Sequence, residues 1–378
     1  MRAVALIDGD HSAEVVAAAL AELPYEIVGA IMVGGNEKLR PGASYGVPLL
    51  DDFADAEIVL DLADEPALPL AARFAWAGRA LAAGLPYQGA DFRFDPPRLE
   101  PIELPSIAVI GSGKRVGKTS LTVHLARLLA RERSVVVVCM GRGGPALPEL
   151  VSSPPTFAEL LRLSRSGRHA ASDHLEVALL AGVTAIGCRR AGGGFAGGVV
   201  SSNVAEGARL AASQEPDIVI FDASGAALPP IAVDRRVLVV GPDADGSSFA
   251  GYRRAVADLV VSVGCEREGA IPATLRLAPL APLQGRVAVF TAGGRDVSHL
   301  AAEVIHVSAN LGDRSALSGE LRRIEADTYV TELKGAAVDL VAEDALARGR
   351  ALVLAGNDVV SERLDEALLA LLAQPVAC

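Results

Sequence analysis

The 378-residue sequence lacks several features that would each point to a class of protein. Only four cysteines occur, and no two of them form a CxxC pair, so the sequence indicates neither a zinc site nor a disulfide framework. No apolar run reaches the roughly 18–20 residues that span a bilayer, and the N-terminus lacks the apolar stretch and cleavage site of a signal peptide. We therefore expect a cytoplasmic protein that does not associate with a membrane.

Positive charge is also scarce. The chain has 35 lysines and arginines against 46 acidic residues, a net charge of −11, which would repel nucleic acid. We therefore expect a small-molecule substrate and no nucleic-acid partner. Only four basic residues are lysine, and the other 31 are arginine. The positions that keep lysine are therefore candidates for a function that needs a compact ammonium group. These lysines are Lys38, Lys114, Lys118 and Lys334.

Short apolar runs alternate with stretches of helical periodicity along the whole chain. This alternation predicts the α/β class with mainly parallel sheets, and the length predicts more than one domain. Proline recurs near residues 95–105 without apolar periodicity, which predicts a linker. We expect a Rossmann-like N-terminal α/β domain over 1–95, a linker over 96–105, a central α/β domain over 106–285 and a smaller C-terminal α/β region over 286–378.

A glycine-rich stretch, Gly111-Ser-Gly-Lys-Arg-Val-Gly-Lys-Thr119, follows a predicted strand and leads into a predicted helix. A phosphate loop needs a strand, a turn whose backbone N–H groups converge on phosphate, a lysine for the β/γ-phosphates and a hydroxyl for Mg²⁺. All four parts are present, so the central domain is predicted to be a P-loop NTPase that binds ATP and Mg²⁺. Lys114 is either a second cation at the γ-phosphate or a solvated loop residue. The predicted nucleotide-binding residues are Gly111, Gly113, Lys114, Val116, Gly117, Lys118, Thr119 and Ser120.

Further candidate residues follow other predicted strands, at the ends where open α/β sheets bind ligands. Asp222 ends an apolar strand and suits a magnesium contact, and the alternative is a strand-end acid that faces solvent. Gly141-Arg-Gly-Gly-Pro145 and Gly187-Cys-Arg-Arg-Ala-Gly-Gly-Gly194 place arginine beside glycine. Their arginines are candidates for bidentate contacts to phosphate or carboxylate, and the alternative is flexible turns with solvated side chains. These arginines are Arg142, Arg189 and Arg190.

The segment His169-Ala-Ala-Ser-Asp-His-Leu-Glu176 holds two histidines and two acids. One interpretation is a capped helix start. Another, which is compatible with the first, is a switch segment with Asp173 near magnesium and His174 near the substrate. A zinc site is disfavoured because a third ligand of matching spacing is missing.

Two N-terminal loops also follow predicted strands. They are Asp8-Gly-Asp-His11 and Gly34-Gly-Asn-Glu-Lys38, in which His11 and Lys38 are candidate substrate contacts. Ordinary strand-to-helix loops explain these residues equally well.

The phosphate loop departs from the strict GxxxxGK[ST] pattern, because its first glycine lies one place earlier. The resulting G-x5-G-K-T spacing resembles the loop of dethiobiotin synthetase. Together with the blocks that follow, the loop makes the sequence resemble the cyclic 2,3-diphosphoglycerate synthetase family. The blocks are residues 6–11, 34–39 and 89–94, Met140-Gly-Arg-Gly-Gly-Pro145, residues 169–174 and 187–194, Ser224-Gly-Ala-Ala-Leu-Pro-Pro230 and, in a last third that matches less, Glu332-Leu-Lys-Gly-Ala-Ala-Val-Asp339.

The resemblance implies an ATP-dependent ligase that closes an intramolecular phosphoanhydride in 2,3-diphosphoglycerate and releases ADP and phosphate. One departure is Asp222, where archaeal members of the family carry glutamate. The alternatives are a P-loop kinase or ligase for another small phosphorylated acid, and a nucleotide-dependent switch or assembly ATPase. We also expect a homodimer. Under this interpretation the catalytic residues are Lys114, Lys118, Arg142, Arg189 and Arg190, the substrate contacts are His11, Lys38, Arg142, His174, Arg189 and Arg190, and the magnesium ligands are Thr119, Asp173 and Asp222.

Overall fold

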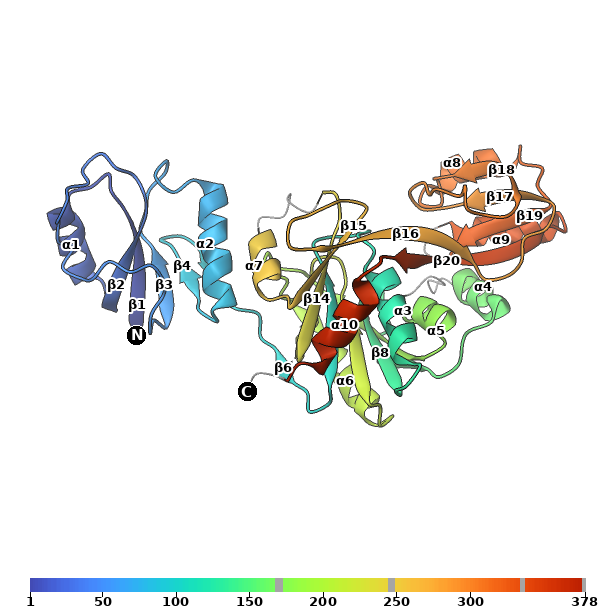
Figure 1. Cartoon of the computed structure of the whole chain (residues 1–378), viewed down its shortest axis with the longest axis horizontal. Helices are drawn as coiled ribbons and strands as arrows, with labels where there is room; N and C mark the ends of the chain where they lie inside the picture. The colour runs from blue at the N-terminus through green and yellow to red at the C-terminus, as the bar shows by residue number, and fades with distance from the viewer. Residues whose placement is uncertain (167–172, 244–248, 334–336, 376–378) are drawn as a thin grey trace. The chain divides into compact units, whose positions relative to one another are not determined.

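A computed structural model describes residues 1–166, 173–243, 249–333 and 337–375. It confirms the α/β class with mainly parallel sheets (Figure 1). The chain forms two compact units. The first is Met1–Arg98 with Gly194–Gly198 and Asp243–Ala257, and the second is Leu99–Gly193, Val199–Pro242 and Asp258–Cys378. Of the residues singled out above, His169 and Lys334 lie outside the described residues. None of the described helices is long and apolar enough to cross a membrane.

The first unit has one sheet with the strand order β2-β1-β3-β4-β5. All neighbouring strands are parallel except β4 and β5. Residues 3–7 of β1 are buried on both faces, which explains why this strand is an unbroken apolar run. The strands are β1 (Arg2–Asp8), β2 (Glu26–Gly34), β3 (Ile58–Asp61), β4 (Tyr87–Gln88) and β5 (Arg93–Phe94), and the helices are α1 (Ala13–Glu22), α2 (Leu70–Ala82) and α7 (Ala250–Ala255).

Aromatic packing explains why two later segments belong to this unit. Five of the nine phenylalanines gather there, with ring centroids 5.2–6.2 Å apart. The side chain of Arg253, which is 2% exposed, donates hydrogen bonds to the main-chain oxygens of Phe249 and Phe195. Contacts distant in sequence therefore complete the unit. The five rings are Phe74, Phe92, Phe94, Phe195 and Phe249.

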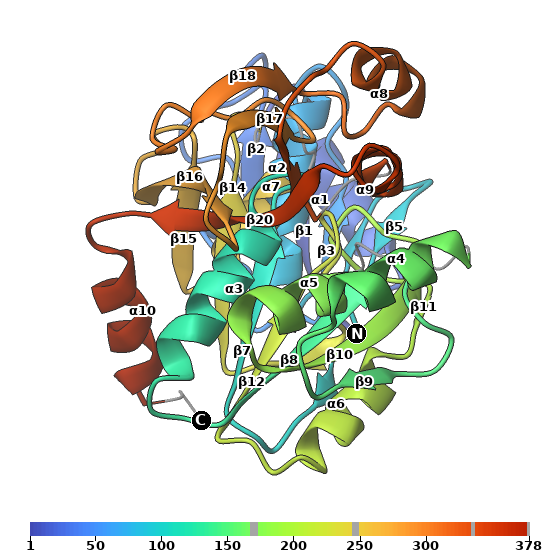
Figure 2. The same cartoon turned by 90° about the vertical axis from the view of Figure 1, so that its right-hand side faces the viewer.

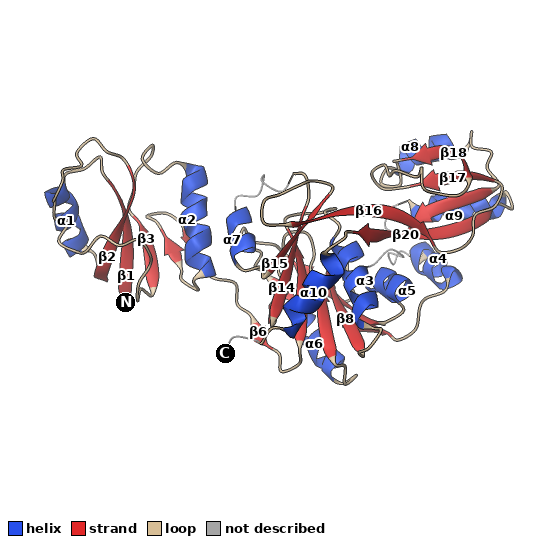
Figure 3. Ribbon diagram, viewed as in Figure 1, coloured by secondary structure: helices blue, strands red, loops and turns tan. Residues whose placement is uncertain are grey.

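The second unit is built on one long mixed sheet, and strands are red in Figure 3. The strand order is β11-β10-β8-β12-β7-β14-β15-β16-β20-β19-β17-β18, and β9 pairs with β10. The strands from β10 to β16 run parallel, so they all end at one edge, which we call the carboxyl edge. The strands of this path are β7 (Ser106–Gly111), β8 (Val135–Gly141), β9 (Glu149–Val151), β10 (Thr184–Ala191), β11 (Ser201–Ser202), β12 (Ile218–Asp222), β14 (Arg235–Val240), β15 (Leu259–Val263), β16 (Ile271–Pro279), β17 (Arg286–Phe290), β18 (Glu303–Ser308), β19 (Thr328–Glu332) and β20 (Ala351–Val360).

Helices cover both faces of the central strands. The ring of His174 on α5 packs on Gly187, and Gly207 on α6 packs on Cys188, the next residue of the same strand, so α5 and α6 lie on opposite faces (Figure 2). The helices of this unit are α3 (Lys118–Leu129), α4 (Phe157–Arg165), α5 (Asp173–Ala181), α6 (Val204–Ala212), α8 (Arg314–Leu321), α9 (Val338–Ala347) and α10 (Leu364–Ala373), and the short strands β6 (Glu100–Pro101) and β13 (Ile231–Ala232) pair apart from the main sheet.

The sheet continues without a break past residue 285. Strand β20 pairs antiparallel with β16, from Thr274↔Val360 to Pro279↔Ala355, and parallel with β19. The sequence predicts only residues 351–354 of β20 as a strand, because Asn357 and Asp358 interrupt its apolar pattern. The C-terminal α/β region is thus joined to the P-loop sheet by hydrogen bonds between strands.

Candidate active site

The phosphate loop connects β7 to α3 at the carboxyl edge. Gly117, just before the helix, has a φ of +97°, which favours glycine, and Arg115 has a φ of +60°. The buried side chain of Lys118 folds back over the loop, where its Nζ donates a hydrogen bond of 2.7 Å to the main-chain oxygen of Gly113. A Cβ on Gly111 would come within 2.6 Å of Lys118 Cδ. The absence of a side chain at residue 111 therefore leaves the space that Lys118 occupies.

Asp222 ends β12, beside the strand that leads into the phosphate loop. It is 1% exposed, so it does not face solvent. Its Oδ2 accepts a hydrogen bond from Thr119 Oγ1 at 3.2 Å, and its Oδ1 accepts one from Thr122 Oγ1 at 3.1 Å. The structure thus brings together two of the three predicted magnesium ligands. Sequence reasoning missed Thr122, which lies one helical turn after Thr119.

We predict that Thr122→Val will destabilise the protein by about 1–3 kcal/mol, because valine has nearly the same shape but leaves a buried oxygen of Asp222 without this donor. Urea unfolding measures the change. Thr122→Ser keeps a hydroxyl and is expected to retain most of the stability. Equal stability of the valine variant and the wild type would show that this hydrogen bond contributes nothing.

Three predicted cations meet beside the phosphate loop. Arg190 is 5% exposed, and its guanidinium donates hydrogen bonds to the main-chain oxygens of Gly192 and Ser224, the latter at 2.9 Å. A Cβ on Gly225 would lie 3.5 Å from Arg190 Nη2 and 3.7 Å from Lys114 Cγ, so the Arg190 guanidinium and the stem of the Lys114 side chain both lie next to this glycine. Burial lowers the pKa of Arg190, and the positive charge of Arg142 lowers it further.

These cations lack acidic partners in the part of the chain that the structure describes. Among the described residues, no carboxylate forms an ion pair with Lys114, Arg142, Arg189 or Arg190. In a chain with a net charge of −11, this is a local excess of positive charge. Such an excess attracts an anion. Sequence reasoning missed Asn203, whose side chain hydrogen bonds both to the loop after Arg142 and to the backbone of Arg189 on β10.

Asp173 and His174 lie on helix α5, whose described residues are Asp173–Ala181. The His174 side chain is 4% exposed, and a Cβ on Gly187 would come within 2.6 Å of its Nδ1 and Cε1. His174 therefore lies between α5 and β10, and glycine at residue 187 makes room for its ring. The roles of Asp173 at magnesium and of His174 at the substrate stay predictions.

His11 and Lys38 lie in the first unit, in loops that follow β1 and β2. A hydrogen bond of 2.9 Å from the Lys38 N–H to the Gly9 oxygen connects these loops. Within the first loop, His11 Nδ1 lies 3.0 Å from Asp8 Oδ1. Burial alone would raise the pKa of Asp8, but hydrogen bonds from His11 and from the N–H groups of Asp64 and Asp10 outweigh it and lower the pKa. The roles of His11 and Lys38 as substrate contacts stay predictions.

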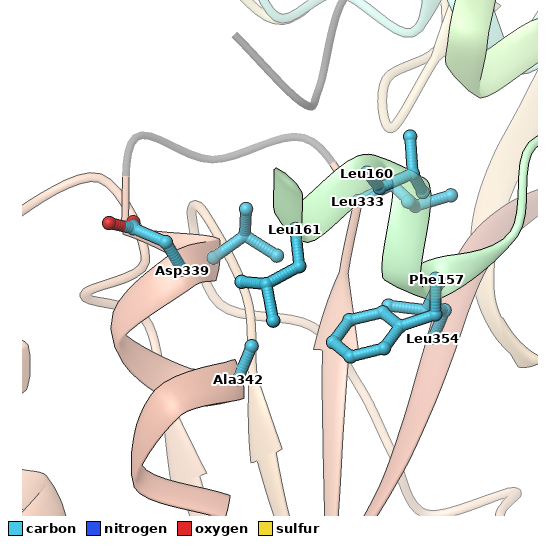
Figure 4. Close-up of a pocket in the computed structure, with 8 residues that line it drawn as sticks. Phe157, Leu160, Leu161, Leu333, Asp339, Ala342 and Leu354 are labelled. Carbon is cyan, nitrogen blue, oxygen red and sulfur yellow. The ribbon is translucent and has the colours of Figure 1, made fainter. Parts of the chain in front are cut away.

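A small apolar cavity lies between α4 and α9 (Figure 4). Its volume of about 20 Å³ has room for about one water molecule, which is too little for a phosphorylated metabolite. The Asp339 carboxylate points away from its leucines and pairs with Arg314 at 2.7 and 2.9 Å. This cavity is therefore a packing gap and not a substrate site.

Comparison with known proteins gives matches along the chain. Three family models, described as the P-loop, C-terminal and N-terminal domains of cyclic 2,3-diphosphoglycerate synthetase, match residues 106–275, 295–358 and 50–95. Curated proteins with that name are similar over nearly the whole length. The Rubrobacter xylanophilus protein is 42% identical over 98% of this chain and 97% of its own, and the Thermococcus gammatolerans protein is 39% identical over 97% and 96%.

A similarity to a solved structure is more distant. The crystal structure of the "apo" form of LpxK from Aquifex aeolicus in complex with ATP has a TM-score of 0.45 and 14% identity, and the match covers 73% of this chain and 91% of that one.

Proposed function

The chain belongs to the cyclic 2,3-diphosphoglycerate synthetase family, an ATP-dependent ligase, and from this premise we propose which residues carry the reaction. The proposed reaction joins the two phosphates of 2,3-diphosphoglycerate in a cyclic phosphoanhydride while ATP gives ADP and phosphate. The observation that carries the proposal is that Lys114 and Arg142 both lie near Arg190 at the phosphate loop, with no acidic partner among the residues that the structure describes. Two polyanions must meet in this reaction, and unneutralised cations reduce their repulsion.

The proposed chemistry has two steps. The γ-phosphoryl group of ATP passes to one phosphate of the substrate and releases ADP, and an oxygen of the other phosphate then attacks that substrate phosphorus. The P–O–P ring forms as the bond to the transferred phosphoryl group breaks, and inorganic phosphate leaves. Catalysis of this kind is mostly positioning and charge stabilisation. We assign Lys118 to the β/γ-phosphates, and Lys114, Arg142, Arg189 and Arg190 to the substrate phosphates and the transferred group.

Magnesium fits the pair Thr119 and Asp222. A hydroxyl and a carboxylate oxygen lie 3.2 Å apart at the start of α3, and Mg²⁺ prefers oxygen ligands of this kind, with water and substrate phosphates completing its shell. When bound, the ion would neutralise charge on the phosphates. The proposal also includes Asp173 as a further magnesium ligand. It keeps His11, Lys38 and His174 as substrate contacts, and a homodimer as the assembly.

The test of this function is product analysis. Purified protein with ATP, Mg²⁺ and 2,3-diphosphoglycerate is expected to give ADP, phosphate and the cyclic product in equal amounts, which phosphorus NMR distinguishes. Omission of 2,3-diphosphoglycerate is the control, and should leave ATP largely intact. Formation of ADP without a cyclic product would favour a kinase, whereas the absence of both would contradict the proposal.

A further inference from the structure

Asn203 occupies the position just before helix α6, where asparagine usually caps the helix with its side chain. Here the side chain makes no capping hydrogen bond. Instead, Oδ1 accepts a hydrogen bond of 2.7 Å from the N–H of Arg189, and Nδ2 donates to the main-chain oxygens of Pro145 at 3.2 Å and Ala146 at 3.1 Å. Both ends of the amide are therefore used in contacts to segments distant in sequence.

The Asn203 contacts join two arginine-bearing segments at the carboxyl edge. One is the loop that follows β8 and contains Arg142, and the other is the end of strand β10, which contains Arg189. The backbone of Arg189 is held on both sides, because its oxygen also accepts hydrogen bonds from the Asn203 N–H at 3.2 Å and from Ser202 Oγ at 3.0 Å. The loop after β8 lies tightly against β10, since a Cβ on Gly144 would come within 2.0 Å of the Cys188 oxygen.

The bridge that Asn203 forms between these two segments also has an electrostatic consequence. The positive charge of Arg142 adds to the effect of burial and lowers the pKa of Arg190, so these two side chains are near enough to repel each other. The neutral amide of Asn203 hydrogen bonds both to the Arg142 loop and to the end of β10. It therefore opposes this repulsion and leaves the positive charge that attracts a substrate unchanged. A carboxylate in its place would neutralise part of that charge.

We propose that Asn203 is a positioning residue, which holds the Arg142 loop and the Arg189 backbone at the spacing that the phosphates of the substrate require. The inference rests on the proposed function, because it assigns these arginines to a phosphorylated substrate. Substrate binding then does not have to bring the Arg142 loop and the end of β10 together. Preorganisation of this kind contributes to catalysis. The side-chain hydrogen bonds of Asn203 go to Arg189, Pro145 and Ala146, which lie outside the phosphate loop.

The test uses Asn203→Ser, because serine is also a good helix cap but is too short to bridge the loops. We expect kcat/KM for 2,3-diphosphoglycerate to fall about 10–100-fold while KM for ATP changes less than about twofold. Hydrogen exchange followed by mass spectrometry should show at least about tenfold faster exchange in residues 141–146. Thr156→Ala, which removes a capping side chain from α4 instead, is the control and should leave kcat/KM and this exchange unchanged.

The outcomes separate this inference from the proposed function. Unchanged exchange in residues 141–146 of Asn203→Ser would overturn the positioning role, whether or not the enzyme makes the cyclic product. Faster exchange with unchanged kcat/KM would also overturn it, because the bridge would then be structural only. An inactive wild-type protein would instead contradict the proposed function, and the exchange measurement would still decide whether Asn203 fixes the loop.

Discussion

Replacing Lys118 with alanine is expected to lower kcat for substrate-dependent ADP release by about 10²–10³-fold, the cost of removing one preorganised charge donor at a transition state. The side chain of Lys118 already lies inside the phosphate loop, with its Nζ 2.7 Å from the Gly113 oxygen. An anion at the loop would offer this ammonium group a stronger partner than a neutral carbonyl. The measurement is ADP release with and without 2,3-diphosphoglycerate.

Lys118→Met separates the charge from the packing, since methionine keeps much of the apolar stem. Both variants should lose activity alike if the ammonium group is what matters. Arg131→Ala, an exposed position just after α3, is the control and should behave as wild type. Substrate-stimulated turnover near the wild-type rate in either Lys118 variant would show that the site is assigned wrongly.

The parts of the site that could be predicted from the sequence are those in which one short stretch contains the whole signal. The phosphate loop is such a stretch, because strand, glycines, lysine and threonine follow in the required order. Asp222 was predicted from its place at the end of an apolar strand. The sequence also predicts that Arg142 and Arg190 lie at the carboxyl ends of strands, and in the structure the parallel strands β8 and β10 end at the same edge of the sheet.

The remainder depends on tertiary contacts with no local signal. Thr122 looks like an ordinary residue inside a helix, and only the position of β12 shows that its hydroxyl reaches Asp222. Asn203 looks like a helix cap, and the structure instead uses its side chain for two distant loops. The full length of β20 could not be predicted from the sequence for a related reason. Polar residues in its second half break the apolar pattern, whereas its pairing with β16 depends on backbone hydrogen bonds.

A single methyl group at Gly111 is expected to remove nearly as much activity as the loss of the Lys118 amine. A Cβ at residue 111 would lie 2.6 Å from Lys118 Cδ and 2.9 Å from its Cγ and Nζ, distances that force the lysine to move. Because a displacement of about 1 Å at a reacting centre costs about 10²-fold in rate, Gly111→Ala should reduce kcat to that extent. The lysine side chain is flexible, so thermal unfolding should shift little.

Gly117→Ala provides a contrast in the same loop. Its added methyl would meet Val263 and Leu275 at 3.4 Å, an ordinary contact, but its φ of +97° strains any residue with a Cβ. We therefore expect Gly117→Ala to lower the stability, by about 1–3 kcal/mol, and Gly111→Ala to lower the activity instead. Gly293→Ala, where an added methyl meets nothing within 4 Å, is the matched control for both measurements. If Gly111→Ala kept the wild-type kcat, the position of Lys118 Nζ against the loop would not be the one that catalysis uses.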